Sequence, residues 1–422
     1  MSSGIIKKFF SDSMLFVFAI VFTKGIGLLM LPIYVSYLTK TELGMYDYII
    51  AVGSFITVIV ALEISQSVIR FGAESSHDKD IQRLYISHGF WFTIICYLVF
   101  LSVALLFLDE VSLFLTDSKD NLMLTLLALL AFFTAALSYL SNVIFRSQLK
   151  SKLAAYSSFL NASVVATTTI LVFKFFDFGV YGVFASLIIG QSIVSTLCFY
   201  LIRDSLTFKF QPKILLEMLK FSSPLVVSSI SVITLTMVDR IVIRHYMSYD
   251  DVAIYGVAAK FASVMVLITI GFQTALSPLI YANSKNEHLK KDLQKLFVLF
   301  VFCGVIVYLA INLLSEFAVA LVAGKEYNES AALVPILSVS VLIHAGYIFF
   351  PGLVLSKRTV ILAFINILSG ILNLILNIFL IQKMGVLGAA YATLISSFVY
   401  FALNAMFSER YFPIFMNSYR KS

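Results

Sequence analysis

The chain has 422 residues, of which 60% are hydrophobic and only 13% are charged, and its mean hydropathy is +0.97. A soluble domain carries about 45–50% apolar and about 25% charged residues, so this composition excludes a soluble enzyme, a disordered regulator and a fibrous protein. In a soluble chain, a formal charge of +7 would suggest a nucleic-acid partner. In a membrane protein it is better explained by basic loops retained on the cytoplasmic side. We therefore expect an integral membrane protein with no nucleic-acid partner.

Twelve segments of the chain are long and apolar enough to cross a membrane, which takes about 20 mostly apolar residues each. The first is too long for a signal peptide and lacks a small-residue cleavage site, so we retain it as a span. The twelve predicted spans are residues 12–38, 44–69, 84–108, 121–145, 153–176, 179–202, 221–246, 252–281, 293–315, 330–355, 359–382 and 385–407.

The placement of the basic residues supports this count. If the N-terminus, with Lys7 and Lys8, lies inside, the inner segments hold about three times as many Lys and Arg residues as the outer ones. An asymmetry of this size over so many alternations is difficult to obtain from a wrong topology. We expect an all-α multi-pass protein with both termini in the cytoplasm.

The two halves of the chain contain a weak internal repeat. The segment Tyr37–Tyr46 aligns with Tyr246–Tyr255, 209 positions later, and Gly179–Gly182 aligns with Gly385–Gly388. These matches fall at corresponding spans, and an even number of spans in each half makes the repeat parallel.

The repeat predicts two six-helix bundles, residues 1–203 and 221–422, joined by a cytoplasmic linker at residues 204–220. Within the linker, Pro212–Lys220 has the pattern of a short amphipathic helix at the membrane interface. Two such bundles suit a V-shaped arrangement around a central cavity, with transport by alternating access.

Charged residues inside predicted spans are costly, at roughly 2.5–3.5 kcal/mol each on insertion scales, and five of them are candidates for the functional site. Counting from the turn between spans 1 and 2 puts Glu63 near the depth of Lys24. Asp239 and Lys260 are equidistant from the turn between spans 7 and 8, with Arg240 beside Asp239. Each acid–base pair is either a structural ion pair or part of a cationic cavity for an anionic substrate. In the second case the carboxylates are candidate proton or sodium sites.

Three further residues have both a structural and a functional interpretation. Arg70 and Arg146 end spans at the inner interface, where they either extend their charges to the interface and fix the topology or form a phosphate-binding rim. His344, in span 10, either titrates during transport or is hydrogen-bonded to a neighbouring helix.

Signatures of soluble chemistry are missing. The sequence has no G-x-x-x-x-G-K-[ST], no G-x-S-x-G and no H-E-x-x-H, and its three cysteines are widely spaced in apolar runs. We therefore expect no ATP hydrolysis, no catalytic residues and no bound metal. A purely structural membrane protein would leave charged residues within both halves unexplained.

Three stretches resemble one family. Gly27–Tyr46 resembles the opening of the polysaccharide-biosynthesis flippases, the O-antigen repeat-unit type, in the multidrug/oligosaccharidyl-lipid/polysaccharide (MOP) exporter superfamily. Phe221–Pro224 with Val238–Arg240 is similar to the start of that family's second half, and Gly385–Thr393 is similar to its last span.

The resemblance implies a MATE-like fold in the inner membrane of a bacterium. It implies movement of undecaprenyl-diphosphate-linked oligosaccharide repeat units, of O-antigen or a related surface polysaccharide, from the cytoplasmic to the periplasmic leaflet. Coupling to H⁺ or Na⁺ would replace any cofactor, and a polysaccharide polymerase and a chain-length regulator would be partners. Lys24, Glu63, Asp239, Arg240 and Lys260 would line the substrate cavity.

Two other functions remain open. A multidrug antiporter of the same superfamily would carry a carboxylate in the outer part of span 1, whereas the charge within span 1 of this chain is Lys24, near its centre. A polysaccharide polymerase or ligase would need a large outer loop with catalytic residues. The longest outer loops here, Asp109–Asn121 and Ser315–Glu329, are short and contain no histidine.

Overall fold

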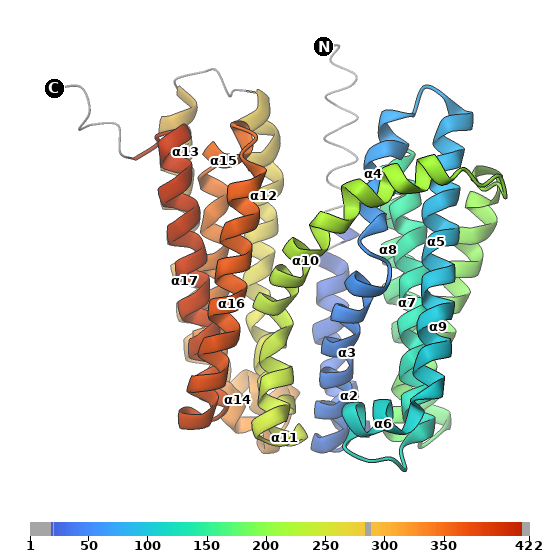
Figure 1. The fold of residues 1–422 in the computed structure, drawn as a ribbon. Coiled ribbons are helices and arrows are strands. Elements are labelled where there is room, and N and C mark those ends of the chain that lie inside the picture. Colours follow the sequence, from blue (N-terminus) through green and yellow to red (C-terminus); the bar gives the residue numbers. More distant parts are fainter. Residues whose placement is uncertain (1–17, 20, 283–287, 416–422) are drawn as a thin grey trace. The chain divides into compact units, whose positions relative to one another are not determined.

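The protein is described by a computed structural model that covers residues 18–19, 21–282 and 288–415, and these residues form helices without a strand (Figure 1). The chain divides into two compact units, residues 1–230 (unit 1) and 231–422 (unit 2). Lys7 and Lys8, which begin the expected inner segments, lie outside the described residues.

The boundary between the units falls within helix α10, Pro212–Tyr246. This one helix contains both the expected amphipathic stretch and the expected seventh span. The amphipathic stretch is therefore the first part of a long helix and not a separate element of the linker.

The described helices agree with a multi-pass membrane protein. Ten of them are long and apolar enough to cross a membrane, and a further pair bent by 41° would make an eleventh span. The remaining expected span, the first, corresponds to the apolar helix Val21–Tyr37. This helix is shorter than the expected span because the span starts at residue 12, before the described residues. An all-α membrane fold is thus confirmed.

Unit 1 consists of helices that pack mainly as the pairs α7–α9, α8–α9 and α4–α7. Besides the first part of α10, its elements are α2 (Leu31–Tyr37), α3 (Lys40–Val60), α4 (Ile64–Glu74), α5 (Lys79–Leu106), α6 (Leu108–Thr116), α7 (Leu122–Ser147), α8 (Ser151–Phe175), α9 (Gly179–Ile202) and the 3₁₀ turn η1 (Arg203–Ser205).

Unit 2 is centred on the packing of α16, α17 and α14. Its elements after α10 are α11 (Tyr249–Ala262), α12 (Val264–Ala282), α13 (His288–Val322), η2 (Lys325–Tyr327), α14 (Asn328–Ala345), η3 (Gly346–Phe349), α15 (Gly352–Leu355), α16 (Thr359–Met384) and α17 (Val386–Tyr411).

The internal repeat is visible in how equivalent helices begin. Thr39 and Glu42 form a capping box at the start of α3, in which each side chain accepts a hydrogen bond from the other residue's backbone N–H. Ser248 and Asp251, 209 positions later, form the same capping box at the start of α11. Capping boxes satisfy backbone N–H groups that the first helical turn leaves unpaired.

A second pair of equivalent positions opens the last span of each unit. Gly179 has φ +52° and Gly385 has φ +59°, a backbone conformation that glycine adopts at little cost. Both residues precede or begin the last long helix of their unit, α9 and α17.

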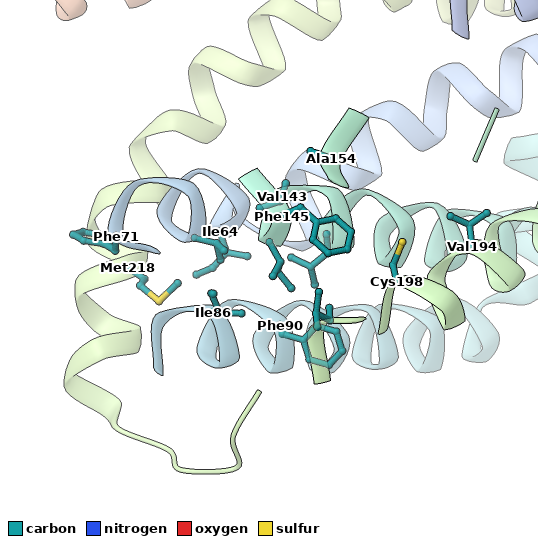
Figure 2. Packing of buried hydrophobic residues seen from close by; sticks show 14 residues of the cluster. Ile64, Phe71, Ile86, Phe90, Val143, Phe145, Ala154, Val194, Cys198 and Met218 are labelled. Carbon is teal, nitrogen blue, oxygen red and sulfur yellow. The ribbon is translucent and has the colours of Figure 1, made fainter. Parts of the chain in front are cut away.

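Buried hydrophobic residues of α4, α5, α7 and α9 form the core at one end of unit 1 (Figure 2). Met218 of α10 is fully buried in this cluster, so the apolar side of the expected amphipathic helix packs on protein. The approach of α4 to α5 is close, because a Cβ atom on Gly89 would lie 2.1 Å from a methyl group of Val68.

Three expected boundaries are corrected by the structure. The second span is broken, because α3 ends at Val60, and Leu62 and Glu63 adopt left-handed backbone angles before α4. Most of the expected outer loop Asp109–Asn121 is the helix α6. The first residues of the expected outer loop Ser315–Glu329 are the end of α13, which runs to Val322.

Candidate functional site

A buried carboxylate lies at the centre of unit 2. The side chain of Asp239, on α10, is 2% exposed and accepts three hydrogen bonds. The Tyr255 hydroxyl donates to Oδ2 at 2.5 Å, the Thr393 hydroxyl to Oδ2 at 3.1 Å, and the Asn377 amide to Oδ1 at 2.6 Å. The donors come from α11, α17 and α16, so this one acid joins four helices. Such bonding is what a carboxylate buried in a membrane protein requires.

Two asparagines on α16 extend this network. Asn373 and Asn377 are one helical turn apart and fully buried. The Asn377 amide donates to the backbone oxygen of Asn373 at 3.0 Å, and the Asn373 amide donates to the Ser396 hydroxyl at 2.9 Å. Oδ1 of Asn377 is buried and accepts no hydrogen bond from the described residues. The cluster therefore contains an oxygen atom available to a further donor or cation.

A pocket of about 360 Å³ opens beside this cluster. Its polar lining consists mostly of neutral hydrogen-bonding side chains together with one cation. The lining residues come from α10, α11, α12, α14, η3 and α17, and the polar and aromatic ones are Thr236, Asp239, Arg240, Tyr255, Thr269, Gln273, Ser340, His344, Tyr347, Thr393 and Ser397.

Arg240 is the cation of this pocket. Its guanidinium group donates to the backbone oxygen of Thr236 at 3.2 Å and lies 5.5 Å from the centre of the Tyr255 ring. The neighbouring Asp239 has its carboxylate bonded to three other side chains. Both residues line the pocket, and the carboxylate is held by side chains of α11, α16 and α17.

Aromatic rings form one side of the pocket. The ring of His344 stacks on Tyr400 with centroids 4.3 Å apart, and Tyr347 meets Tyr400 edge-on at 5.5 Å. His344 and Tyr347 both line the pocket. A second small cavity shares Gln273 and Tyr347 with it and continues toward Pro351. Both cavities are thus lined by residues of α12 and η3.

The expected acid–base pairs are not the contacts that the structure shows. Lys24 is exposed on the helix Val21–Tyr37, and Glu63 accepts a hydrogen bond from the Ser65 hydroxyl at 3.1 Å, with no ion pair recorded between Lys24 and Glu63. The estimate of depth assumed an unbroken second helix, whereas Glu63 lies in the break. The carboxylate of Asp239 is bonded by tyrosine, asparagine and threonine side chains instead of Lys260.

The two expected rim arginines lie at helix ends of unit 1. Arg70 is bridged to Glu74 at 3.0 Å, with both side chains about half exposed, and its guanidinium carbon lies 4.5 Å from the ring centre of Phe221. Arg146, in the last turn of α7, is exposed. Neither is assigned to a pocket.

Unit 1 has a polar cluster that the sequence reasoning missed. The rings of Tyr34 and Tyr46 lie with centroids 5.5 Å apart, and the Thr169 hydroxyl lies 2.9 Å from that of Ser186. Asp47, beside Tyr46 on α3, is buried. Asp47 falls within an expected span and could have been found as a charge in the membrane.

The sequence also carried a signal for the unit 2 cluster. Asn373 and Asn377 are separated by one helical turn in an otherwise apolar stretch, which places two amides on one helix face. Tyr255 and Thr393 had no comparable signal, because a single tyrosine or threonine in a span is common.

The donor set around Asp239 fits a proton or a monovalent cation. It offers one carboxylate and the neutral oxygens of Tyr255, Asn377 and Thr393. Throughout the described ranges, no group of three or more His, Cys, Asp or Glu side chains could hold a metal ion. Transition metals prefer imidazole nitrogen and thiolate sulfur as ligands. The side chains around Asp239 supply neither, so the cluster does not suit a transition metal.

Sequence comparisons relate the chain to glycan transport. A family model described as polysaccharide biosynthesis protein matches residues 10–282, and a MatE model matches residues 224–379. A probable low-salt glycan biosynthesis flippase of Haloferax volcanii, Agl15, is 24% identical over 211 residues. That match covers 48% of this chain and 43% of the relative, so it spans less than half of the relative's length.

Solved structures share the fold. An inward-facing multidrug resistance MATE family transporter of the MOP superfamily has a TM-score of 0.67 at 15% identity, covering 91% of this chain and 97% of that one. An outward-facing MATE structure has a TM-score of 0.65 at 14% identity, covering 94% and 93%. A MOP superfamily transporter from Pyrococcus furiosus, whose binding pocket of reversed polarity suggests a different function, has a TM-score of 0.64 at 13% identity, covering 94% of each chain. The fold is thus MATE-like, and the chain belongs to the polysaccharide biosynthesis protein family.

Proposed function

We propose that this protein is a flippase for a polyprenyl-diphosphate-linked oligosaccharide. The substrate would be undecaprenyl diphosphate carrying a repeat unit of O-antigen or a related surface polysaccharide. Alternating access would move it from the cytoplasmic to the periplasmic leaflet of a bacterial inner membrane. A sugar hydroxyl entering hydrocarbon without a partner costs several kcal/mol. A polar-lined path removes that cost while the lipid tail stays in the bilayer.

The observation that carries the proposal is the composition of the unit 2 pocket. Its neutral hydroxyl and amide groups suit sugar hydroxyls, and Tyr347 offers a ring face for a sugar to pack on. Arg240 supplies charge-assisted donors for a phosphate or an acidic sugar. The pocket's carboxylate is engaged by three donors. A carrier of cationic drugs would need the opposite arrangement.

Other charged residues are assigned supporting roles. Lys24 and Lys260 would attract the diphosphate together with Arg240, and Glu63 would balance their charge. Arg70 and Arg146 would contact phosphate as the substrate enters. His344 would contact the glycan or change its protonation during transport. These roles follow from charge and position in the chain.

We propose further that Asp239 couples transport to an H⁺ or Na⁺ gradient. A proton would neutralise the carboxylate directly. A sodium ion would be met by the carboxylate, and the Asn377 oxygen that accepts no hydrogen bond would be a further ligand. Binding of either ion removes the negative charge that Tyr255, Asn377 and Thr393 hold in place. The helices α10, α11, α16 and α17 would then repack.

In this account the protein performs no covalent chemistry and uses no ATP. It would deliver the repeat unit to a polysaccharide polymerase working with a chain-length regulator.

Complementation of a flippase-deletion strain tests the proposal. The wild-type gene should restore surface polysaccharide. The Arg240→Gln variant should restore much less of it at equal protein level, with Arg240→Lys as the control that keeps the charge. Neutralising Lys24 and Lys260 together should also abolish the polysaccharide. If the gene instead confers resistance to cationic drugs and Arg240→Gln leaves the polysaccharide normal, the multidrug antiporter is the better assignment.

A further inference from the structure

A second cavity, apart from the unit 2 pocket, lies on the surface of unit 1. It is an open groove of about 360 Å³ between α5, α7 and α9. Large hydrophobic side chains beside it on α9, such as Ile193 and Leu197, are about half exposed, as lipid-facing residues are. The groove is lined by Phe90, Trp91, Ile94, Leu137, Ser141, Ser195, Thr196 and Phe199.

A non-helical segment runs along α5 at one end of this groove. The backbone of residues 206–211, between η1 and α10, is bonded to four side chains that lie along α5. Two backbone oxygens accept from α5: the Arg83 side chain donates to the Leu206 oxygen at 3.2 Å, and the Trp91 ring N–H donates to the Thr207 oxygen at 3.1 Å. Two backbone N–H groups donate to α5: that of Thr207 to the Ser87 hydroxyl at 2.8 Å, and that of Gln211 to Nε2 of His88 at 2.8 Å.

These bonds fit a segment that lies at the membrane interface. Backbone groups near hydrocarbon need partners within the protein, because water is not available to them. The same segment presents large apolar rings outward, since Phe208 is 87% exposed and Phe210 is 67% exposed. Phe208 stacks on Trp91 with centroids 4.9 Å apart, so the segment adjoins the groove.

Cations lie at this end of the groove. Arg203 follows the groove residue Phe199 by four positions, which on a helix is one turn, or about 6 Å. Its guanidinium lies 4.2 Å from the ring centre of Tyr200 and 3.9 Å from the Asp204 carboxylate, with the Arg203 side chain 55% exposed. Lys209, which is exposed, stands between the two outward phenylalanines.

We propose that this groove binds one anionic glycerophospholipid. An acyl chain would lie between Phe90, Trp91 and Phe199. The phosphate headgroup would lie at Arg203 and Lys209. The apolar channel with cations at one end matches the two ends of such a lipid, and the exposed Phe208 would insert beside it. This site lies in unit 1, so it does not depend on the function proposed for the unit 2 pocket.

The chain contains a single tryptophan, Trp91, and this residue lines the groove. The purified full-length protein would be placed in nanodiscs containing phosphatidylglycerol or phosphatidylcholine brominated on the acyl chains. Bromine quenches indole fluorescence on contact. At equal mole fraction, brominated phosphatidylglycerol should quench Trp91 several-fold more strongly than brominated phosphatidylcholine.

Matched variants identify the residues responsible. A cation near an anionic membrane contributes about fivefold to binding, so Arg203→Ser with Lys209→Ser should remove most of this several-fold headgroup preference. Lys79→Ser with Lys150→Ser removes two exposed cations elsewhere in unit 1 and should leave the preference unchanged. Thr196→Phe, at an exposed groove position, should reduce quenching by both lipids.

Three outcomes would overturn the inference. One is equal quenching by the two headgroups in the wild-type protein. Another is an equal loss of preference in both double-cation variants, which would indicate general surface charge. The third is displacement of brominated phosphatidylglycerol by undecaprenyl phosphate at much lower concentration than by unlabelled phosphatidylglycerol, which would assign the groove to the transported lipid.

Discussion

The two units use the same repeat positions differently. In unit 2, Asp239 is bonded directly to Tyr255. At the positions 209 residues earlier, unit 1 has Met30, which is buried, and Tyr46. The tyrosine is thus kept and the acid is replaced by an apolar side chain. The nearest acid of unit 1, Asp47, follows Tyr46 on α3 instead of lying on the first helix of the unit.

The other two residues that bond to Asp239, Asn377 and Thr393, also differ from their counterparts in unit 1. The place of Asn377 and Thr393 in unit 2 is taken in unit 1 by the hydroxyl pair of Thr169 and Ser186. The ring of Tyr34 lies beside that of Tyr46, with centroids 5.5 Å apart. The hydroxyl groups of unit 1 thus interact with one another, and its buried acid, Asp47, comes from a different helix position than Asp239. The comparison therefore shows that the two units place their buried acids differently.

The largest effect is expected at Asp239. Asp239→Asn should abolish flipping, because the amide cannot exchange a proton or neutralise a cation. Asp239→Ala should in addition lower stability by about 1–3 kcal/mol, since it leaves three buried donors unpaired. Met30→Leu, the matched change in unit 1, should leave transport near wild type. Transport of lipid-linked oligosaccharide in proteoliposomes measures the first effect, and thermal unfolding in detergent measures the second. Robust flipping by Asp239→Asn would remove Asp239 from the coupling step.

Arg240 should give the next largest effect. Its counterpart in unit 1 is Leu31, which is fully buried. A hydrogen bond to a charged group contributes about 1.5–3 kcal/mol, so Arg240→Gln should weaken substrate binding at least about tenfold. The maximal rate should change less than the half-saturating concentration. Equal affinity in the variant would show that the anionic part of the substrate binds elsewhere.

Two equivalent glycines should differ in their tolerance of alanine. A Cβ atom on Gly388 would lie 2.2 Å from the backbone oxygen of Leu380, whereas on Gly182 it would lie 3.1 Å from a Val172 methyl group. Backbone cannot move aside as a side chain can, so Gly388→Ala should cost about 1–3 kcal/mol and Gly182→Ala clearly less. Melting temperatures from size-exclusion chromatography of heated samples compare the two. A larger loss for Gly182→Ala would contradict the described packing of α16 against α17.

The smallest difference is expected between the two capping boxes. Glu42 accepts a hydrogen bond from the Val180 N–H at 3.1 Å in addition to its bonds with Thr39. The capping interactions described for Asp251 are those with Ser248. A lost cap costs about 1 kcal/mol, so Glu42→Ala should destabilise slightly more than Asp251→Ala. The same melting assay applies, and the reverse order would show that the link from α3 to α9 adds nothing to stability.

The sequence predicted the helices better than it predicted the site. Span positions follow from apolar run length and charge asymmetry, which are properties of the chain alone. The expected pairing of Lys24 with Glu63 was wrong, because equal distance from a turn gives equal depth only for unbroken helices. Residues Leu62 and Glu63 interrupt the second span, and no glycine or proline there signals the break.

The site itself depends on helix rotation, which hydropathy does not give. Asp239 and Arg240 were found because charges are rare in spans. The structure shows that both line the pocket and that the acid also bonds to side chains of α11, α16 and α17. Adjacent residues on a helix point about 100° apart, so the two side chains can contact different neighbours. Tyr255 and Thr393 became recognisable only when α11 and α17 were brought together with α10.

The central claim is most directly tested by reconstituting the purified protein in liposomes with a polyprenyl-diphosphate oligosaccharide. Exposure of the glycan on the opposite leaflet would be followed under an imposed proton or sodium gradient. The account predicts gradient-dependent flipping that Asp239→Asn abolishes and Arg240→Gln weakens, with Met30→Leu near wild type. No flipping by the wild-type protein, together with gradient-driven movement of cationic drugs that requires Asp239, would contradict it.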